Sequence, residues 1–158
     1  MGDSRATRAH WGHMMWIVLA CLLTVGGCRK IKMMTGIGET IEQADTGSPE
    51  AVLQDAIVAA QIEDEGKAWR QYRALIHPNE VKRTNQKKLW RTDRFARFRR
   101  QIDNYLLDPS IPSFNLVGYK VLESGEHVLQ IESNKSETGT PCTFAEHEGA
   151  FYIKSCSL

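Results

Sequence analysis

The sequence predicts an α+β fold in which N-terminal helices pack on a curved antiparallel sheet of about four strands. Apolar residues first recur at helical spacing, and short segments rich in branched and aromatic residues then follow, separated by turn signals. Helices followed by a strand meander are the order of an α+β domain. The chain has 158 residues, 42% of them hydrophobic and 25% charged. This composition suits one globular domain and excludes a coiled coil or a multi-span membrane protein.

The first 27 residues have the layout of an export signal. Arg5 and Arg8 give a basic start, and a stretch without charge runs from Met14 to Gly27. Its 14 residues are too few to cross a membrane, which needs roughly 20. We therefore expect residues 1–27 to be a signal peptide.

The residues at the end of this signal, Val25-Gly26-Gly27-Cys28, resemble the lipobox of bacterial lipoproteins. The resemblance implies cleavage before Cys28 and a Cys28 that carries three acyl chains, which anchor a protein stably in a membrane. The resemblance also implies a location: in enteric-type bacteria an Asp after the lipidated Cys retains a lipoprotein at the inner membrane, so Arg29 favours the outer membrane of the cell envelope, with the protein facing the periplasm or the cell surface. The alternatives are an ordinary signal peptide that ends near a Cys and a short anchor that stays uncut.

The mature chain begins with a predicted tether. Residues 28–47 include the lipidated Cys and contain no aromatic residue, so we expect them to be flexible, with a single domain over 48–158. Ser48-Pro49-Glu50 indicates a helix start, with Ser as N-cap and Pro at the first helical position. The apolar spacing that follows predicts a helix over about 49–63.

A second helix is predicted over about 66–76. The run Glu63-Asp64-Glu65-Gly66 is interpreted as the end of the first helix, although acids there oppose the helix dipole. The second helix has an apolar side and stops before Pro78, because a residue that precedes Pro avoids the helical region. That side consists of Trp69, Tyr72, Leu75 and Ile76.

Residues 79–107 are strongly basic, with nine Lys and Arg against three acids. Apolar residues at helical spacing predict that the segment is helical, and Thr92-Asp93 is interpreted as a cap that divides it into 79–91 and 93–107. The basic residues are Lys82, Arg83, Lys87, Lys88, Arg91, Arg94, Arg97, Arg99 and Arg100.

Beyond Pro109 the pattern changes to that of strands. Strands are predicted at 114–122, 127–133, 142–145 and 151–155. Turns are predicted at Ser124-Gly125, Thr138-Gly139 and Glu148-Gly149.

Two cysteines remain once the signal is removed and Cys28 is acylated. Outside the cytoplasm, where disulfides form, Cys142 and Cys156 are expected to pair. Two free buried thiols are the alternative.

The helical region and the final hairpin carry a second resemblance. Ser48-Pro49-Glu50 before an Ala-rich helix, and a hairpin with Glu148-Gly149 before Phe151, resemble small bacterial lipoproteins with an NTF2-like or cystatin-like domain. The resemblance implies a cone-shaped fold with a pocket between helices and sheet. Such domains include enzymes and ligand binders, so the fold alone assigns no activity.

The basic segment is the main candidate site. It would contact an acidic surface, either anionic lipid or an acidic partner in the envelope. The alternative is a solvated helix face whose charges pair with acids elsewhere in the domain. From Cys28 to the C-terminus basic and acidic residues balance, so the local excess of +6 in residues 79–107 is offset by −6 elsewhere. The export signal excludes nucleic acid as a partner.

Other polar residues form weaker candidates. His127 and His147 lie beside acids at turns and are interpreted as exposed turn residues, and His77 as a helix-end residue. Asp103 beside a tyrosine would imitate the acid and phenol of NTF2-like isomerases, although no motif supports it. The tyrosines in question are Tyr72, Tyr105 and Tyr119.

Taken together, these patterns predict a membrane-anchored envelope lipoprotein that acts as a non-enzymatic interaction or binding module. The alternative is a small-molecule binder or enzyme that uses an NTF2-like pocket. No catalytic residue, metal or cofactor is assigned.

Overall fold

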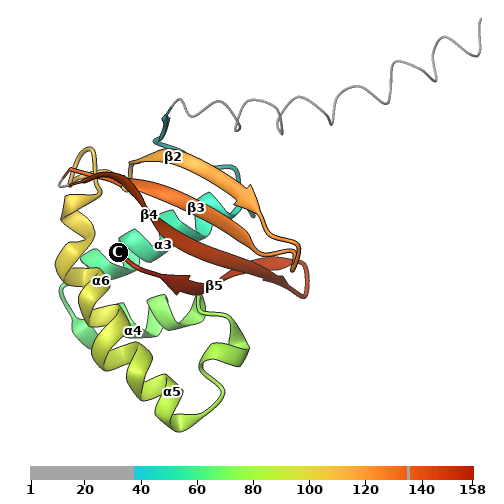
Figure 1. The fold of residues 1–158 in the computed structure, drawn as a ribbon. Coiled ribbons are helices and arrows are strands. Elements are labelled where there is room, and N and C mark those ends of the chain that lie inside the picture. The colour runs from blue at the N-terminus through green and yellow to red at the C-terminus, as the bar shows by residue number, and fades with distance from the viewer. Residues whose placement is uncertain (1–37, 135) are drawn as a thin grey trace, which may run out of the picture. The chain divides into compact units, whose positions relative to one another are not determined.

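The described residues contain five strands in one antiparallel sheet, in which each strand pairs with the next along the chain (Figure 1). The computed structural model describes residues 38–134 and 136–158, so the signal segment and Cys28 lie outside it. The strands are β1 (Glu39–Ile41), β2 (Phe114–Val121), β3 (His127–Ser133), β4 (Ser136–His147) and β5 (Ala150–Cys156). The α+β prediction is confirmed, and the expected four strands are one too few.

The additional strand is β1, which lies within the expected tether 28–47. Its residues pair with the first three residues of β2, and the Thr40 hydroxyl lies 2.8 Å from Oδ1 of Asn115. A strand of three residues, two of them exposed, is too short to show an alternating pattern in the sequence. The sheet therefore begins before residue 48.

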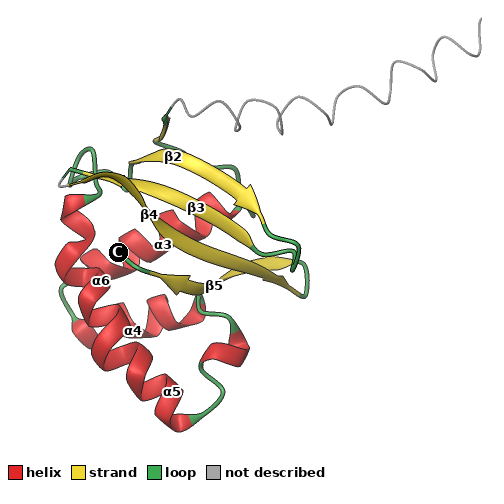
Figure 2. Cartoon of the chain, in the orientation of Figure 1, coloured by secondary structure: helices red, strands yellow, loops and turns green. Residues whose placement is uncertain are grey.

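Between residues 38 and 158, as far as the structure describes them, four α-helical segments accompany the sheet, and α3 crosses behind it in Figure 2. They are α3 (Pro49–Gln61), α4 (Glu65–Ala74), α5 (Thr84–Leu89) and α6 (Ala96–Gln101). The predicted helix start is confirmed, because the Ser48 hydroxyl accepts a hydrogen bond from the Ala51 amide at 3.2 Å and Pro49 is the first helical residue. Residues Leu53, Ala56 and Ile57 of α3 are fully buried and contribute to the core.

The acids between the first two helices belong to the second one. The first helix ends at Gln61, and the Asp64 carboxylate accepts a hydrogen bond from the Lys67 amide at 2.6 Å, which makes Asp64 the N-cap of α4. Glu65 lies in the first turn of α4, at the positive end of that helix dipole. The prediction that these acids end the first helix is wrong. Because they lie at the start of α4, they no longer oppose the dipole of the first helix.

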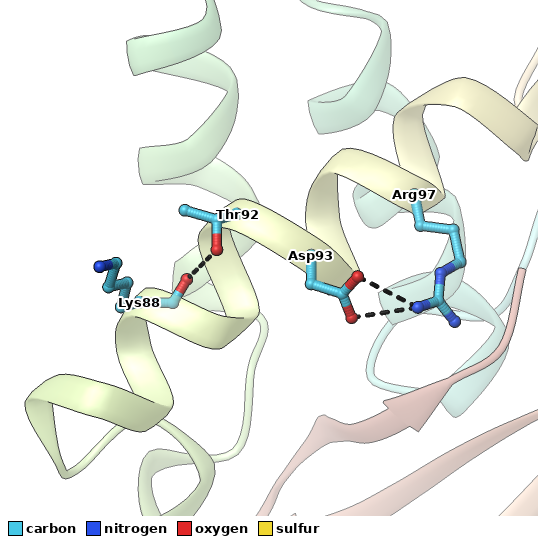
Figure 3. A network of polar contacts seen from close by, with 4 residues as sticks. All are labelled: Lys88, Thr92, Asp93 and Arg97. Carbon is cyan, nitrogen blue, oxygen red and sulfur yellow. Dashed lines mark hydrogen bonds and ion pairs between the residues drawn. The ribbon is translucent and has the colours of Figure 1, made fainter.

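The helical segment continues through Thr92-Asp93, so the predicted break there is wrong (Figure 3). The Thr92 hydroxyl donates to the carbonyl oxygen of Lys88, one turn earlier, at 3.0 Å. Asp93 binds the Arg97 guanidinium, one turn later, at 3.1 Å. Both side chains therefore bond within a continuing helix instead of capping a new one.

A π-helical turn, η2 (Trp90–Phe95), joins α5 to α6. Trp90 and Phe95 are five residues apart and both are buried, with 2% and 1% of their surfaces exposed. Five residues of α-helix would place the two rings on different sides, whereas a wider π turn brings both to the core. The chain then passes through α6 and a short 3-10 turn, η3 (Ile102–Asn104).

Aromatic rings from α4 and from this helical segment pack against each other. The ring of Phe95 lies 4.7 Å from that of Tyr72 and 5.6 Å from that of Trp69, and Phe98 lies 5.2 Å from Tyr72. These separations fall in the range that favours tilted aromatic pairs. The basic segment is thus fixed to the domain by its apolar side.

The hairpin of β4 and β5 has the turn and the disulfide that the sequence predicts. Glu148 and Gly149 both have positive φ, 52° and 81°, as a two-residue hairpin loop of the primed type requires. Cys142 and Cys156 are opposite each other across the two strands and form a disulfide. The prediction of this pair is confirmed.

The predicted turn at Thr138-Gly139 is wrong, because β4 runs through it. A Cβ atom on Gly139 would lie 2.7 Å from Cγ2 of Val117 and 2.9 Å from Cβ of Gln130. This Gly therefore allows side chains of β2 and β3 to pack over β4, and it is not a turn residue.

The chain after α4 covers the free edge of β5. The amide of His77 donates to the Ile153 carbonyl at 2.9 Å, and the Ile153 amide donates to the Leu75 carbonyl at 2.8 Å. Ile76 and Ile153 form a parallel bridge and are both buried. The predicted stop before Pro78 thus places His77 beside the sheet.

Candidate functional site: the basic helical segment

Three of the nine basic side chains make contacts within the domain. The Arg99 guanidinium donates from Nε to the carbonyl oxygen of Ala60 at 2.9 Å and from Nη2 to that of Ile62 at 2.8 Å. These carbonyls lie at the C-terminal end of α3, where a helix lacks internal partners and carries partial negative charge. Arg99 is therefore a structural residue.

The other two contacts are made by Arg94 and Arg97. The Arg94 guanidinium carbon lies 4.5 Å from the centre of the Trp90 ring, in a cation–π geometry. Arg97 forms the ion pair with Asp93 described above, and about half of each side chain is exposed. Among the described residues, this is the only ion pair of the basic segment, so no described acid outside the segment forms an ion pair with its cations.

The remaining six cations make no ion pair with a described carboxylate. Five of them surround α5 and will be called the α5 basic cluster: Lys82, Arg83, Lys87, Lys88 and Arg91. The sixth, Arg100, is exposed on α6. No Asp or Glu occurs between residues 81 and 92. The positive charge is therefore concentrated at one end of the basic segment.

Leu89 lies within this cluster and is 48% exposed. Its neighbour Trp90 is 2% exposed and holds the end of α5 to the core. Figure 1 shows α5 at the opposite end of the folded domain from β1. The charge pattern of the sequence indicated the cations but not Leu89. Two apolar residues, Leu89 and Trp90, lie between Lys88 and Arg91, and the sequence does not show which of them is exposed.

A second group of polar side chains surrounds His77, which is only 7% exposed. Its ring lies 5.2 Å from that of His147 and 6.2 Å from that of Tyr152, and its Nδ1 accepts a hydrogen bond from the Asn79 amide at 3.3 Å. Burial lowers the pKa of His77, and the nearby His147 and Lys154 lower it further. His77 therefore lies at a helix end, as predicted, and is also buried against the rings of His147 and Tyr152.

Lys154 completes this region with an ion pair to Glu126 at 2.5 Å. The hydrogen bond between them lowers the pKa of Glu126 and raises that of Lys154. Glu126 precedes β3 and Lys154 lies on β5, so the pair joins segments on either side of β4. Both groups are held in their charged forms.

His127 and His147 belong to different clusters. The Tyr119 hydroxyl and Nδ1 of His127 share a hydrogen bond, and the His127 ring lies 4.7 Å from that of Phe151. His147 contacts His77 and Tyr152 instead. His127 is a partly buried strand residue, so the interpretation as an exposed turn residue is wrong for it. His147 ends β4 directly before the turn, its side chain is 40% exposed, and its Nε2 lies 3.9 Å from the Glu148 carboxylate.

The proposed pairing of Asp103 with a tyrosine is not formed. Asp103 is exposed on η3, whereas Tyr72 is buried against Phe98. The Tyr105 hydroxyl lies 3.1 Å from that of Thr140, and Tyr119 bonds to His127.

In residues 38–134 and 136–158 no three His, Cys, Asp or Glu side chains are grouped in a way that could hold a metal ion. Over the same residues no helix is both long and apolar enough to cross a membrane. No family model, curated protein or solved structure matches the chain.

Proposed function

We propose that this protein is a bacterial lipoprotein, anchored through Cys28 in the cell envelope, most favourably in the outer membrane. Its folded domain acts as a non-enzymatic interaction module. The sequence Val25-Gly26-Gly27-Cys28 after a basic and apolar start supports the anchor. The disulfide between Cys142 and Cys156 is the cross-link expected of an exported protein.

The α5 basic cluster is the observation that carries the interaction role. Its five cations have no acid within the segment that holds them, and no described carboxylate pairs with them. Like charges left together on a surface weaken the fold by repulsion unless a partner of opposite charge binds there. The partner is an acidic envelope protein or an anionic lipid surface.

The rival function, a small-molecule binder or enzyme with an NTF2-like pocket, has less support. An NTF2-like or cystatin-like identity remains part of the proposal, because helices against an antiparallel meander agree with that layout. The acid that the rival would use, Asp103, is exposed, and Tyr105 and Tyr119 bond to other side chains.

The anchor is tested by growing a bacterium that expresses the full chain with a tagged palmitate analogue. Wild type is expected to take up the label and to sediment with membranes, and Cys28→Ala is expected to lose the label. Cys21→Ala is the matched control, because Cys21 lies in the segment to be removed. Label that persists in Cys28→Ala, or disappears in Cys21→Ala, overturns the lipoprotein proposal.

The interaction role is tested by crosslinking in intact envelopes. A variant with Lys88→Glu and Arg91→Glu is expected to lose crosslinked products that wild type forms, whereas Arg100→Glu with Lys120→Glu, of equal net charge, is expected to keep them. All four side chains are exposed. An identical set of products from both variants would remove the cluster from the proposed function.

A further inference from the structure

We infer that the α5 basic cluster is a membrane-docking surface for anionic phospholipid headgroups, with Leu89 entering the boundary between headgroups and acyl chains. This inference rests on the proposed function and names the partner of the same surface. It is carried by the composition of the cluster, by the exposure of Leu89 and by the place of α5 in the fold.

The cations of the cluster suit a surface of repeated phosphate groups. Lys82, Arg83, Lys87, Lys88 and Arg91 follow one another along a short loop and helix with no acid among them. A protein partner would need carboxylates matched to these positions, whereas a layer of anionic headgroups accepts cations at any spacing. Each cation close to such a surface strengthens binding about fivefold.

Leu89 supplies an apolar contact in the same place. The side chain is 48% exposed, and the helix that carries it is fixed to the core through Trp90. An exposed apolar residue among basic ones is typical of helices that lie at a membrane interface. Burial of the exposed part of Leu89 would strengthen binding by a further factor of about five.

The place of α5 agrees with contact to a flat surface. It protrudes at the end of the folded domain opposite β1 (Figure 1). The chain between Cys28 and Gly38 can span at most about 35 Å, which is close to the diameter of a domain of this size. A tether extended to nearly its full length would therefore allow α5 to reach the membrane that holds the anchor.

The test uses the chain from residue 28 onward with Cys28→Ser, so that no lipid contributes. Sedimentation is measured with vesicles of phosphatidylcholine alone and with vesicles that contain about 30% phosphatidylglycerol. We expect binding to the anionic vesicles only, with at least a tenfold loss between 0.05 and 0.5 M NaCl, because salt screens exposed charges.

Two pairs of variants identify the surface. Lys88→Glu with Arg91→Glu is expected to lose at least tenfold in binding, and Arg100→Glu with Lys120→Glu, of equal net charge, is expected to lose no more than about twofold. Leu89→Ala is expected to bind the vesicles about fivefold more weakly. Leu107→Ala is the matched control, because the exposed fractions of Leu107 and Leu89 are 50% and 48%, and it is expected to keep wild-type binding.

Equal binding to neutral and anionic vesicles, no binding to either, or equal losses in both charge variants would overturn the inference. Equal losses in Leu89→Ala and Leu107→Ala would remove Leu89 from it. If the chain crosslinks to proteins through the cluster but does not bind vesicles, the partner of the surface is an acidic protein and the inference is wrong. The lipid label on Cys28 is measured separately, so failure of the anchor and failure of the docking surface give different results.

Discussion

At the scale of single residues, two adjacent arginines differ in role, because one stabilises the fold and the other is exposed to solvent. The Arg99 guanidinium bonds to two carbonyl oxygens at the end of α3, and Arg100, the next residue, is exposed. Sequence alone could not separate them, because both belong to one basic run and the difference depends on a helix about forty residues earlier.

Arg99→Ala is expected to destabilise the fold by about 1–3 kcal/mol, since it removes two charge-assisted hydrogen bonds to helix carbonyls. Urea unfolding of the two variants Arg99→Ala and Arg100→Ala measures this. Arg100→Ala is expected to change the free energy of unfolding by less than about 0.5 kcal/mol. Equal effects of the two would contradict the structural role of Arg99.

His77 links stability to pH. Burial, with His147 and Lys154 nearby, lowers its pKa in the folded state below the unfolded value of 6.5. Well above pH 6.5 His77 is neutral in both states, and as the pH falls towards 6.5 and below, the unfolded state gains the proton more readily than the folded state. The free energy of unfolding should therefore decrease as the pH falls from 6.5 towards the folded pKa.

We expect wild type to lose stability between pH 7 and pH 5.5, and His77→Gln to lose less over the same range. Urea unfolding at several pH values measures the slope. His127→Gln is the control, because His127 contacts Tyr119 and Phe151 in place of His77. A slope that does not change in His77→Gln would show that another group titrates in this window.

At the scale of elements, the sequence predicted those that have local signals. Ser48-Pro49 marked the start of α3, and Glu148-Gly149 marked the turn of the last hairpin, because both depend on backbone conformation within a few residues. The strand β1, the π turn η2 and the first half of β4 were missed. Each depends on contacts with distant residues, such as the packing of Val117 over Gly139.

The hairpin of β4 and β5 is expected to depend on its disulfide. A double variant, Cys142→Ala with Cys156→Ala, should lose about 3 kcal/mol, because the bond closes a loop of about 15 residues in the unfolded chain. Urea unfolding of the oxidised protein measures the difference, and reduced wild type should show a similar loss. Equal stability of the oxidised protein and the double variant would contradict this expectation.

At the scale of the whole molecule, balanced charge hides a separation of charge. The local excess of +6 in residues 79–107 was visible in the sequence. The sequence did not show which of these cations contact the domain and which are left without a partner among the described residues. Arg94, Arg97 and Arg99 contact the domain itself, and most of the uncompensated charge lies around α5, with Arg100 exposed on α6. The candidate surface is therefore smaller than the sequence suggested and contains an apolar residue that charge counting could not reveal.

The two edges of the sheet have a further consequence. Residues 75–77 cover β5, and β1 pairs only with residues 114–116 of β2. Among the described residues, residues 117–121 of β2 therefore pair with β3 on one side and have no strand on the other. A free edge is a template on which another chain can add a strand and begin to aggregate. A β-bulge after Leu116 and the exposed Lys120 oppose such addition, since one bends the edge and the other charges it. If the proposed lipid anchor gathers copies in the plane of one membrane, these two features would protect them against joining edge to edge.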